Sequence, residues 1–465
     1  MINFLGYLSL IFFSFLIETT HTFAQSKLNI ELIGHWDSDT ILHGSTNVKF
    51  SDVWGYAANG REYALICSTE GTHFFDITNN VIQFVDFIEG DFKSTTVTNR
   101  DVTTYKNYAY SVCDHGPSKL QIMDLSYLPD SVHLVKTVDS LFGRAHNLFV
   151  DEENALLYVC RITTIQNGNP TTVTPMRVFS LQDPLNPALI YEGPTSITEV
   201  HDIWVQNGLA ILNCGYDGLK IYDFSNPSMP ILKQNLSVYQ QQGYNHQGSL
   251  SPDGTKYIFG DETNGKMIKY CEFNSNNQLV VKRYFGTNHL NNSIPHNMYC
   301  SNELAYVAYY NEGLRIFDIR SNNIQEIAHY DTYPEEHSFK MNGAWGIYTQ
   351  LPSKRILISD IQHGLFVFNF DEEHALKLKN DINVYPTVLN QGTGFTVQID
   401  PALATNFEVR ILDVIGKIVY TGSYFDQTFA HIDPNFGSGL FFVEINYIDY
   451  LKEEKSILTK ILILD

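Results

Sequence analysis

The sequence has few basic residues for its length. Its 465 residues include 30 Lys and Arg against 51 Asp and Glu, which gives a formal net charge of −21 at pH 7. A protein that binds nucleic acid needs clustered basic side chains against the phosphates, and the sequence contains no Lys/Arg cluster. We therefore expect no nucleic-acid partner.

Cysteines are also scarce, and their spacing argues against a disulfide framework. Four of the six fall at similar places in successive repeats of the chain: Cys67, Cys113, Cys160 and Cys214. Equivalent positions in neighbouring repeats are expected to lie beyond the ~4.4–6.8 Å Cα separation that a disulfide requires. We expect buried free thiols that behave as small apolar side chains. The sequence does not decide whether Cys271 and Cys300 form a disulfide.

Long apolar runs are missing apart from one at the N-terminus. Leu5 to Ile17 is nearly continuous but too short to span a bilayer, which takes about 20 residues. The small residue Ala24 follows it, before Gln25. This pattern is typical of a signal peptide, here residues 1–24. We expect a secreted or outer-surface protein without a transmembrane helix.

Common catalytic motifs are absent as well. The sequence contains no Gly-x-Ser-x-Gly elbow, no phosphate-binding loop and no His-Glu-x-x-His helix. These absences exclude the hydrolases, nucleotide-binding proteins and metalloproteases that depend on those motifs.

What the sequence does contain is a short segment that returns seven times, at intervals of roughly 50 residues. The copies are SDVWGYA, RDVTTYK, AHNLFVD, VHDIWVQ, NHQGSLS, PHNMYCS and NGAWGIY. Their second positions are Asp52, Asp101, His146, His201, His246, His296 and Gly343. The recurring polar position raises the question of a shared site.

Each copy is followed by the pattern of three further strands. In the fourth repeat an apolar strand, Leu209–Leu212, leads to a turn at Asp217-Gly218, then to a strand that ends at Asp223 and a fourth strand up to Val238. Glycine in such turns supplies positive φ. Four short strands per repeat, seven times, predict an all-β fold, a seven-bladed β-propeller over residues 26–370.

The two ends of the repeat region predict how the ring closes. The last repeat lacks a fourth strand before residue 371, whereas residues 29–37 resemble the fourth strand at residues 324–331. We therefore expect the N-terminal strand to complete the last blade, which would protect its edge.

The tail differs from the repeats. After a linker at residues 371–380, alternating segments such as Phe395–Ile399 and Gly439–Val443 predict a small Ig-like β-sandwich over residues 381–465.

Two resemblances go beyond these patterns. The segment around the third strand, as in Tyr222-Asp223-Phe224 before Ser225-Asn226-Pro227, resembles the LVIVD repeat, and residues 26–370 resemble the choice-of-anchor B family of secreted propellers. Tyr385-Pro386, Asp413 to Lys417, Gly439–Val443 and the strand at Lys460 resemble the C-terminal sorting domain of the Por (type IX) secretion system of Bacteroidetes. Thr387-Val388 departs from the Asn-Pro that often follows in that domain. The resemblance implies that residues 381–465 contact the type IX export machinery.

The histidines carry the main hypothesis about chemistry. Innermost strands line the channel of a propeller, so His146, His201, His246 and His296 are candidate ligands of a divalent transition metal. The candidate channel-mouth ligand contacts beside them are Asp52, Asp101, Asn147, Asp202 and Asn297. Turns expected on the same face add Glu70, Asp114, His115, Asp217, Glu262, Glu312 and His363. The alternative is that these residues are structural or contact a ligand without metal.

From the sequence we favour a monomeric, non-enzymatic binding or scaffold protein with an unidentified surface ligand or protein partner. A secreted metal-dependent hydrolase or oxidase, centred on the four histidines, is the alternative. No catalytic residue and no certain cofactor is assigned.

Overall fold

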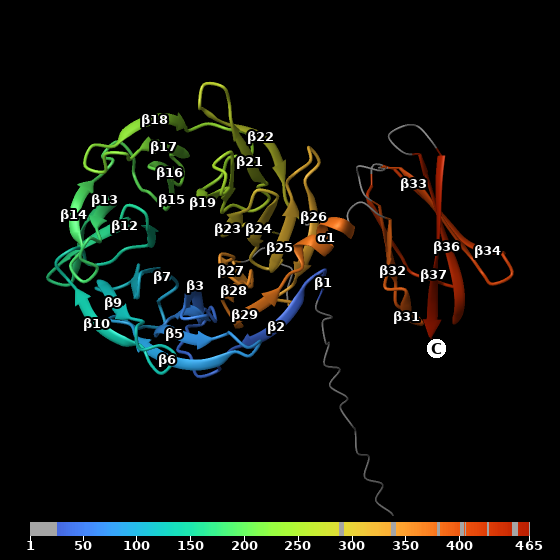
Figure 1. Ribbon diagram of the computed structural model, residues 1–465, viewed down its shortest axis with the longest axis horizontal. Coiled ribbons are helices and arrows are strands. Elements are labelled where there is room, and N and C mark those ends of the chain that lie inside the picture. The colour runs from blue at the N-terminus through green and yellow to red at the C-terminus, as the bar shows by residue number, and fades with distance from the viewer. Residues whose placement is uncertain are drawn as a thin grey trace, which may run out of the picture.

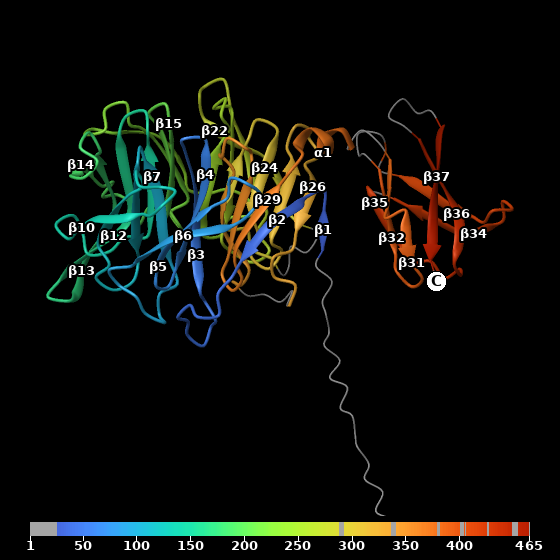
Figure 2. The same cartoon turned by 60° about the horizontal axis from the view of Figure 1, so that its bottom comes forward.

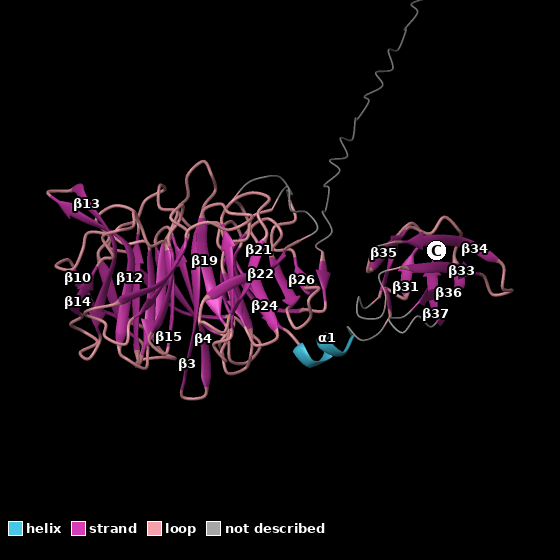
Figure 3. Cartoon of the chain, turned by 90° about the horizontal axis from the view of Figure 1, so that it is seen from above, coloured by secondary structure: helices cyan, strands magenta, loops and turns pink. Residues whose placement is uncertain are grey.

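The computed structural model describes residues 26–287, 293–335, 341–378, 382–399, 404, 406–425, 427–448 and 454–464. The signal peptide expected at residues 1–24 lies outside the described residues. These form β-strands and one short helix, α1 (Glu372–Leu378), as Figure 3 shows. Within the described ranges, no helix is both long and apolar enough to cross a membrane.

Antiparallel sheets stand side by side around a central axis (Figure 1). Each sheet is given from its innermost to its outermost strand. The first sheet contains β3 (Phe50–Ala58), β4 (Arg61–Ser68), β5 (Gly71–Asp76) and β6 (Gln83–Glu89), and the second contains β7 (Arg100–Tyr105), β8 (Tyr108–Cys113), β9 (Leu120–Asp124) and β10 (His133–Val138). The third sheet contains β11 (Asn147–Asp151), β12 (Leu156–Gln166), β13 (Asn169–Ser180) and β14 (Ala188–Glu192). The next two are β15 (Asp202–Gln206), β16 (Leu209–Asn213), β17 (Leu219–Asp223) and β18 (Ile231–Leu236); and β19 (Asn245–Leu250), β20 (Lys256–Asp261), β21 (Ile268–Phe273) and β22 (Leu279–Phe285).

The last two sheets of the ring take strands from both ends of the repeat region. One contains β23 (Met298–Cys300), β24 (Leu304–Ala308), β25 (Leu314–Asp318) and β26 (Gln325–Tyr330), with β1 (Lys27–Leu28) as a fifth strand. The other contains β27 (Ala344–Tyr348), β28 (Ile356–Asp360), β29 (Gly364–Asn369) and β2 (Glu31–Trp36). Innermost strands contact one another in turn, and β23 contacts β27, which contacts β3. The ring is therefore closed.

The N-terminal strand pairs as the sequence predicts. In the register of β2 against β29, Glu31 lies opposite Asn369 and Trp36 opposite Leu365. A second pairing was not predicted, because β1 is only two residues long: Lys27 lies opposite Tyr330 on the outer edge of β26. The N-terminal segment thus holds two neighbouring sheets.

The aspartate that ends four of the third strands, β5, β9, β17 and β25, has a local role. The Asp76 carboxylate accepts a hydrogen bond from the backbone N–H of Thr78 at 2.9 Å, and Asp223 accepts one from Ser225 at 3.0 Å. Asp124 and Asp318 make the same contact two residues further on. This Asx turn redirects the chain towards the fourth strand, which explains why the aspartate recurs.

Glycine between the second and third strands follows the prediction in part. Gly313 has φ of 73°, and a Cβ there would lie 2.2 Å from the carbonyl oxygen of Tyr330. Gly71 stands in the corresponding turn of the first sheet, but its φ is not positive. Space is the constraint there, since a Cβ would lie 2.2 Å from the carbonyl oxygen of Ile88.

Apolar side chains fill the space between neighbouring sheets. One cluster joins Tyr110 and Ile122 to Leu157 and Phe179 of the next sheet. The inner strands β7 and β8 are buried along almost their whole length, whereas much of β10 is exposed. All six cysteines are buried free thiols, which confirms the prediction and leaves Cys271 and Cys300 unbonded.

The residues that follow Cys160 extend the central hairpin of their sheet. β12 and β13 continue as a long exposed hairpin that projects beyond its neighbours in Figures 2 and 3. Asn167 and Gly168 turn the hairpin with φ of 51° and 77°.

Residues after the ring form two further sheets around one core. The first contains β30 (Asn383–Tyr385), β32 (Phe395–Gln398) and β35 (Phe429–Ile432); the second contains β31 (Val388–Asn390), β37 (Glu454–Leu464), β36 (Gly439–Ile448), β33 (Phe407–Leu412) and β34 (Ile418–Tyr424). Val397 and Ile432 face Val443 and Ile461 between the sheets. The expected linker contains α1, whose Ala375 packs into the core of the ring.

Candidate functional site

The four histidines form one continuous arc at the start of four inner strands. The ring centroids of His146 and His201 are 4.2 Å apart, those of His201 and His246 4.3 Å, and those of His246 and His296 4.3 Å. Trp345 extends the arc, 4.2 Å from His296. The structure thus brings all four predicted histidines together.

The two ends of the arc are held by hydrogen bonds. Nδ1 of His146 lies 3.0 Å from an oxygen of Asp114 and 3.1 Å from the side-chain nitrogen of Asn99. Nδ1 of His296 lies 2.7 Å from the carbonyl oxygen of Trp345. The two histidines in the middle of the arc lack such bonds. Nδ1 of His201 and Nδ1 of His246 are buried without a hydrogen-bond partner in the described part of the chain.

Burial keeps the inner histidines neutral. It lowers the pKa of His246 and that of His296 to about 3, with neighbouring histidines adding to the effect. Burial, followed by the His146 and His246 charges, lowers the pKa of His201 well below its ordinary value. Neutral imidazole is the form that offers a nitrogen lone pair.

Glu262 lies against this arc, although the sequence placed it only among the turn residues. Its carboxylate oxygens are 3.8 Å from Nε2 of His246 and 3.9 Å from Nε2 of His296. The hydroxyl of Tyr310 donates to the same carboxylate. Glu262 directly follows β20, the second strand of its sheet. This position, in the turn on the histidine face, was the signal in the sequence that could have identified Glu262 as a site residue.

Asp114 is the other turn residue that contacts a histidine. It forms an ion pair with His115 as well as the bond to His146, and the Asp114 hydrogen bond raises the pKa of His115 to about 9. Elsewhere, Glu312 pairs with Arg315 at 2.6 Å, and His363 pairs with Glu335 at 2.9 Å. These last two do not join the arc.

Carboxylates and amides form a second level of the channel. The strand registers place Asp101 opposite Val112, Asn147 opposite Cys160 and Asp202 opposite Asn213, each one residue after the histidine position. A bulge in β3 brings Asp52 to the same level. In β7 the histidine position is occupied by Arg100, and Asp52 and Asp101 line the small cavity together with the four histidines.

The carboxylates of the second level, Asp52, Asp101 and Asp202, are buried, and hydrogen bonds satisfy part of this level. Asn147 donates to Asp202 at 3.1 Å, and the backbone N–H of Leu148 donates to Asp101. Burial, followed by the Asp101 charge, raises the pKa of Asp52 and that of Asp202 well above their ordinary values. The side-chain oxygens of Asn147 and Asn297 are buried without a partner among the described residues.

The free space at both levels is small. A cavity of about 20 Å³ is lined by the four histidines together with the carboxylates and amides, and one of about 50 Å³ is lined by the same carboxylates and by apolar side chains. A water molecule needs roughly 10–15 Å³ measured in this way. The channel therefore accommodates ions or a few waters.

The fold is that of a WD40-like β-propeller. The solved structure described as the crystal structure of RRP9 WD40 repeats aligns with a TM-score of 0.51 and 9% identity, covering 75% of this chain and 100% of that chain. At this identity the likeness shows the fold alone.

Within that class, the chain carries LVIVD repeats. Residues 199–238 and 297–332 match the LVIVD repeat model, which is consistent with the propeller family that the sequence resembles. These segments cover the β15–β18 and β23–β26 sheets. No curated protein sequence matches the chain.

Proposed function

We propose that this chain is an exported, non-enzymatic β-propeller scaffold that binds an ion-sized ligand at the histidine end of its channel. In this proposal the ring has seven blades, and the Ig-like unit at residues 381–465 is a type IX sorting domain. The placement outside the cell rests on the signal-peptide pattern of residues 1–24.

One observation carries the ligand-binding part. Buried polar atoms are almost always hydrogen-bonded, yet four such atoms without a described partner gather around two adjoining small cavities. They are Nδ1 of His201, Nδ1 of His246, Oδ1 of Asn147 and Oδ1 of Asn297. A ligand at these cavities would satisfy them.

Thermal melting with a panel of ligands tests this part. Divalent metals, phosphate and ammonium would each be added to wild type and to the pair variant His201→Leu/His246→Leu. We expect at least one class to raise the Tm of wild type and not that of the variant. The exposed pair His43→Leu/His133→Leu is the control and should respond like wild type. A panel without any shift contradicts the proposal.

Export is tested separately in a host with a type IX system. The chain without residues 381–465 should accumulate in the periplasm, and a periplasmic reporter fused to residues 381–465 should leave the cell. Equal export of both forms of the chain would overturn the sorting role.

A metal-dependent oxidase or hydrolase is the second candidate. The carboxylate of Glu262 beside two histidine nitrogens favours it, because such a group can act as a general base near a metal. The cavities restrict its substrate to a few atoms. Turnover of peroxide or dioxygen by metal-loaded wild type, lost in Glu262→Gln, would support the enzyme over the scaffold.

A further inference from the structure

The hydrogen bond of His296 fixes where its lone pair lies. A backbone carbonyl accepts hydrogen bonds and never donates, so Nδ1 of His296 carries the proton that bonds to Trp345 at 2.7 Å. In the neutral ring the lone pair is then on Nε2. That nitrogen faces a carboxylate oxygen of Glu262 at 3.9 Å.

Two electron-rich groups therefore face each other without a proton between them. The 3.9 Å separation, and the 3.8 Å from Glu262 to Nε2 of His246, exceed a hydrogen bond. Both distances are compatible with a metal ion bound between the two atoms, because two metal–ligand bonds of about 2.1 Å separate the ligand atoms by up to about 4.2 Å. A cation in this position would turn repulsion into attraction.

His201 supplies a third nitrogen from the neighbouring sheet. Ligand atoms of His201, His246 and Glu262 lie within 4.8 Å of one another. His201 is 5% exposed and His246 3% exposed, and neither Nδ1 has a described partner. Both imidazoles are thus buried next to Glu262 with unused bonding capacity.

We propose that His201, His246 and Glu262 bind one divalent transition-metal ion, beside His296, whose Nε2 faces the same carboxylate. This assignment rests on the proposed function and names the ligand of the same site. Two imidazoles and one carboxylate suit Zn²⁺, Fe²⁺, Co²⁺ or Cu²⁺, whereas Mg²⁺ and Ca²⁺ prefer oxygen ligands throughout.

Hydrogen bonds from neighbouring groups fix the orientation of the site's side chains, as hydrogen bonds to the ligands do in known metal sites. The Trp345 carbonyl orients His296, and the Tyr310 hydroxyl donates to Glu262. Such contacts fix the tautomer and the position of a ligand before the ion arrives. The aromatic rings of Trp345 and Tyr310 also cover His296 at 4.2 and 4.9 Å.

His146 is outside this ligand set, although it belongs to the arc. Its Nδ1 is engaged by Asp114 and Asn99, and Glu262 has its short approaches to His246 and His296. The site therefore differs from a symmetrical ring of four histidines. His146→Gln serves as the matched control, since it changes the same residue type in the same arc.

The experiment measures metal bound by the tag-free chain. Wild type and variants would be dialysed against Zn²⁺ or Co²⁺, with metal content determined by elemental analysis and affinity by titration. We expect about one ion per chain, and Co²⁺ absorption in the visible range typical of nitrogen and oxygen ligands. His246→Gln and Glu262→Gln should weaken Zn²⁺ binding by at least about 100-fold, since even outer contacts contribute 10–100-fold. His146→Gln should bind as wild type does.

Each result decides between the two proposals. Circular dichroism and melting in metal-free buffer check that the variants fold. A folded wild type that takes up no Zn²⁺ or Co²⁺, or prefers Mg²⁺ or Ca²⁺, overturns the metal assignment. If phosphate or ammonium still raises its Tm, the scaffold proposal survives. Equal loss of binding in His146→Gln contradicts the ligand set.

Discussion

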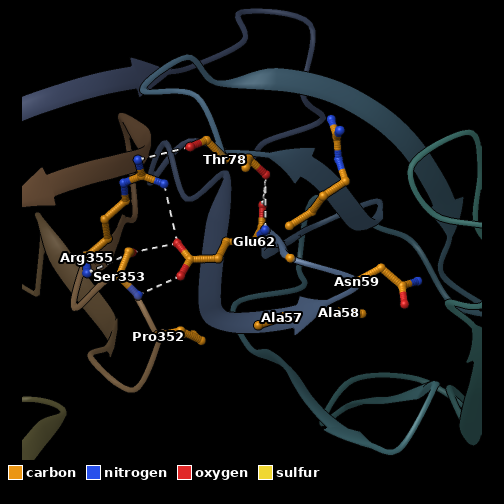
Figure 4. A pocket seen from close by; sticks show the side chains of 10 residues that line it. Ala57, Ala58, Asn59, Glu62, Thr78, Pro352, Ser353 and Arg355 are labelled. Atoms are coloured by element: carbon orange, nitrogen blue, oxygen red, sulfur yellow. Dashed lines mark hydrogen bonds and ion pairs between the residues drawn. The ribbon is translucent and has the colours of Figure 1, made fainter.

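The carboxylate of Glu62 accepts hydrogen bonds from the backbone N–H and the hydroxyl of Ser353, at 2.6 and 2.5 Å, across 291 residues of sequence. Arg355 adds a bond to Glu62 at 3.3 Å and donates to the carbonyl oxygen of Thr78 (Figure 4). It also donates to the carbonyl oxygen of Ile77. These side chains line a cavity of about 430 Å³. The first and last sheets of the ring are thus joined by side chains as well as through β2.

Replacing Glu62 should weaken this junction. Glu62→Ala leaves the Ser353 donors without their acceptor, and the loss of such partly buried hydrogen bonds costs about 1–3 kcal/mol each. We expect a lower free energy of unfolding in urea. Glu153→Ala, at an exposed position, is the control and should change little. Equal stability of Glu62→Ala and wild type would mean that the junction is not energetically important.

The N-terminal strands allow a graded test of closure. Removing residues 26–36 deletes both β1 and β2, and leaves the edge of β29 unpaired. Removing residues 26–28 deletes β1 alone. We expect a large fall in Tm for the longer deletion and a small one for the shorter. Similar melting of the two truncated chains would show that β2 does not hold the ring.

Much of the ring was predictable because its pattern repeats. Strand, turn and terminal aspartate recur with the same spacing, and the missing fourth strand near residue 371 identified its replacement. Pairing of β1 was not predictable, since two residues carry no periodicity. Helix α1 escaped detection because its signal is brief: Ala375 and Leu376 are the apolar residues that pack on the ring.

The site was predictable only where it repeats. His146, His201, His246 and His296 share one register, so the arc followed from alignment. Glu262 occurs once, and its relation to two histidines depends on how neighbouring sheets pack. The level of Asp52 depends on a bulge in β3, which shifts the register without changing the spacing of the sequence pattern.

The buried His73 predicts a measurable dependence of stability on pH. Burial lowers its pKa from 6.5 to about 4, so the unfolded chain binds the proton more tightly. Its contribution to stability is fully present above pH 6.5 and is lost as the pH falls towards 4. Between pH 7.5 and 4.5 this amounts to about 2–3 kcal/mol.

His73→Phe should remove that part of the acid sensitivity. The aromatic contacts with Trp36 and Phe87 can persist, whereas the 3.0 Å contact with Ser68 is lost. Urea unfolding at the two pH values measures the difference, with the exposed His43→Phe as control. An unchanged pH dependence in His73→Phe would contradict the assignment.

The six thiols should be unreactive in the folded chain. All are buried, and burial raises the pKa of Cys67 and that of Cys160 well above the ordinary value, so little thiolate forms. A chromogenic disulfide reagent should therefore detect almost no thiol in native protein and six in guanidinium. Reducing agent should leave the Tm unchanged. Fewer than six thiols in denatured, unreduced protein would reveal a disulfide.

The ion pair of Lys269 and Asp261 is completely buried, with a separation of 2.9 Å. Asp261 also accepts hydrogen bonds from the Tyr239 hydroxyl at 2.8 Å and from the backbone N–H of Gly243 at 2.6 Å. Lys269→Met removes the one basic partner that the described residues provide for this carboxylate and leaves a buried charge. We expect a loss of about 3–5 kcal/mol in the free energy of unfolding.

The double variant Lys269→Met/Asp261→Asn should recover part of that loss, because it removes the uncompensated charge. The exposed pair of Lys233 and Asp223, 3.4 Å apart, provides the comparison: Lys233→Met should cost less than about 1 kcal/mol. Urea unfolding of the four proteins completes the test. If Lys269→Met costs no more than Lys233→Met, the buried pair does not contribute to stability in the way its burial implies.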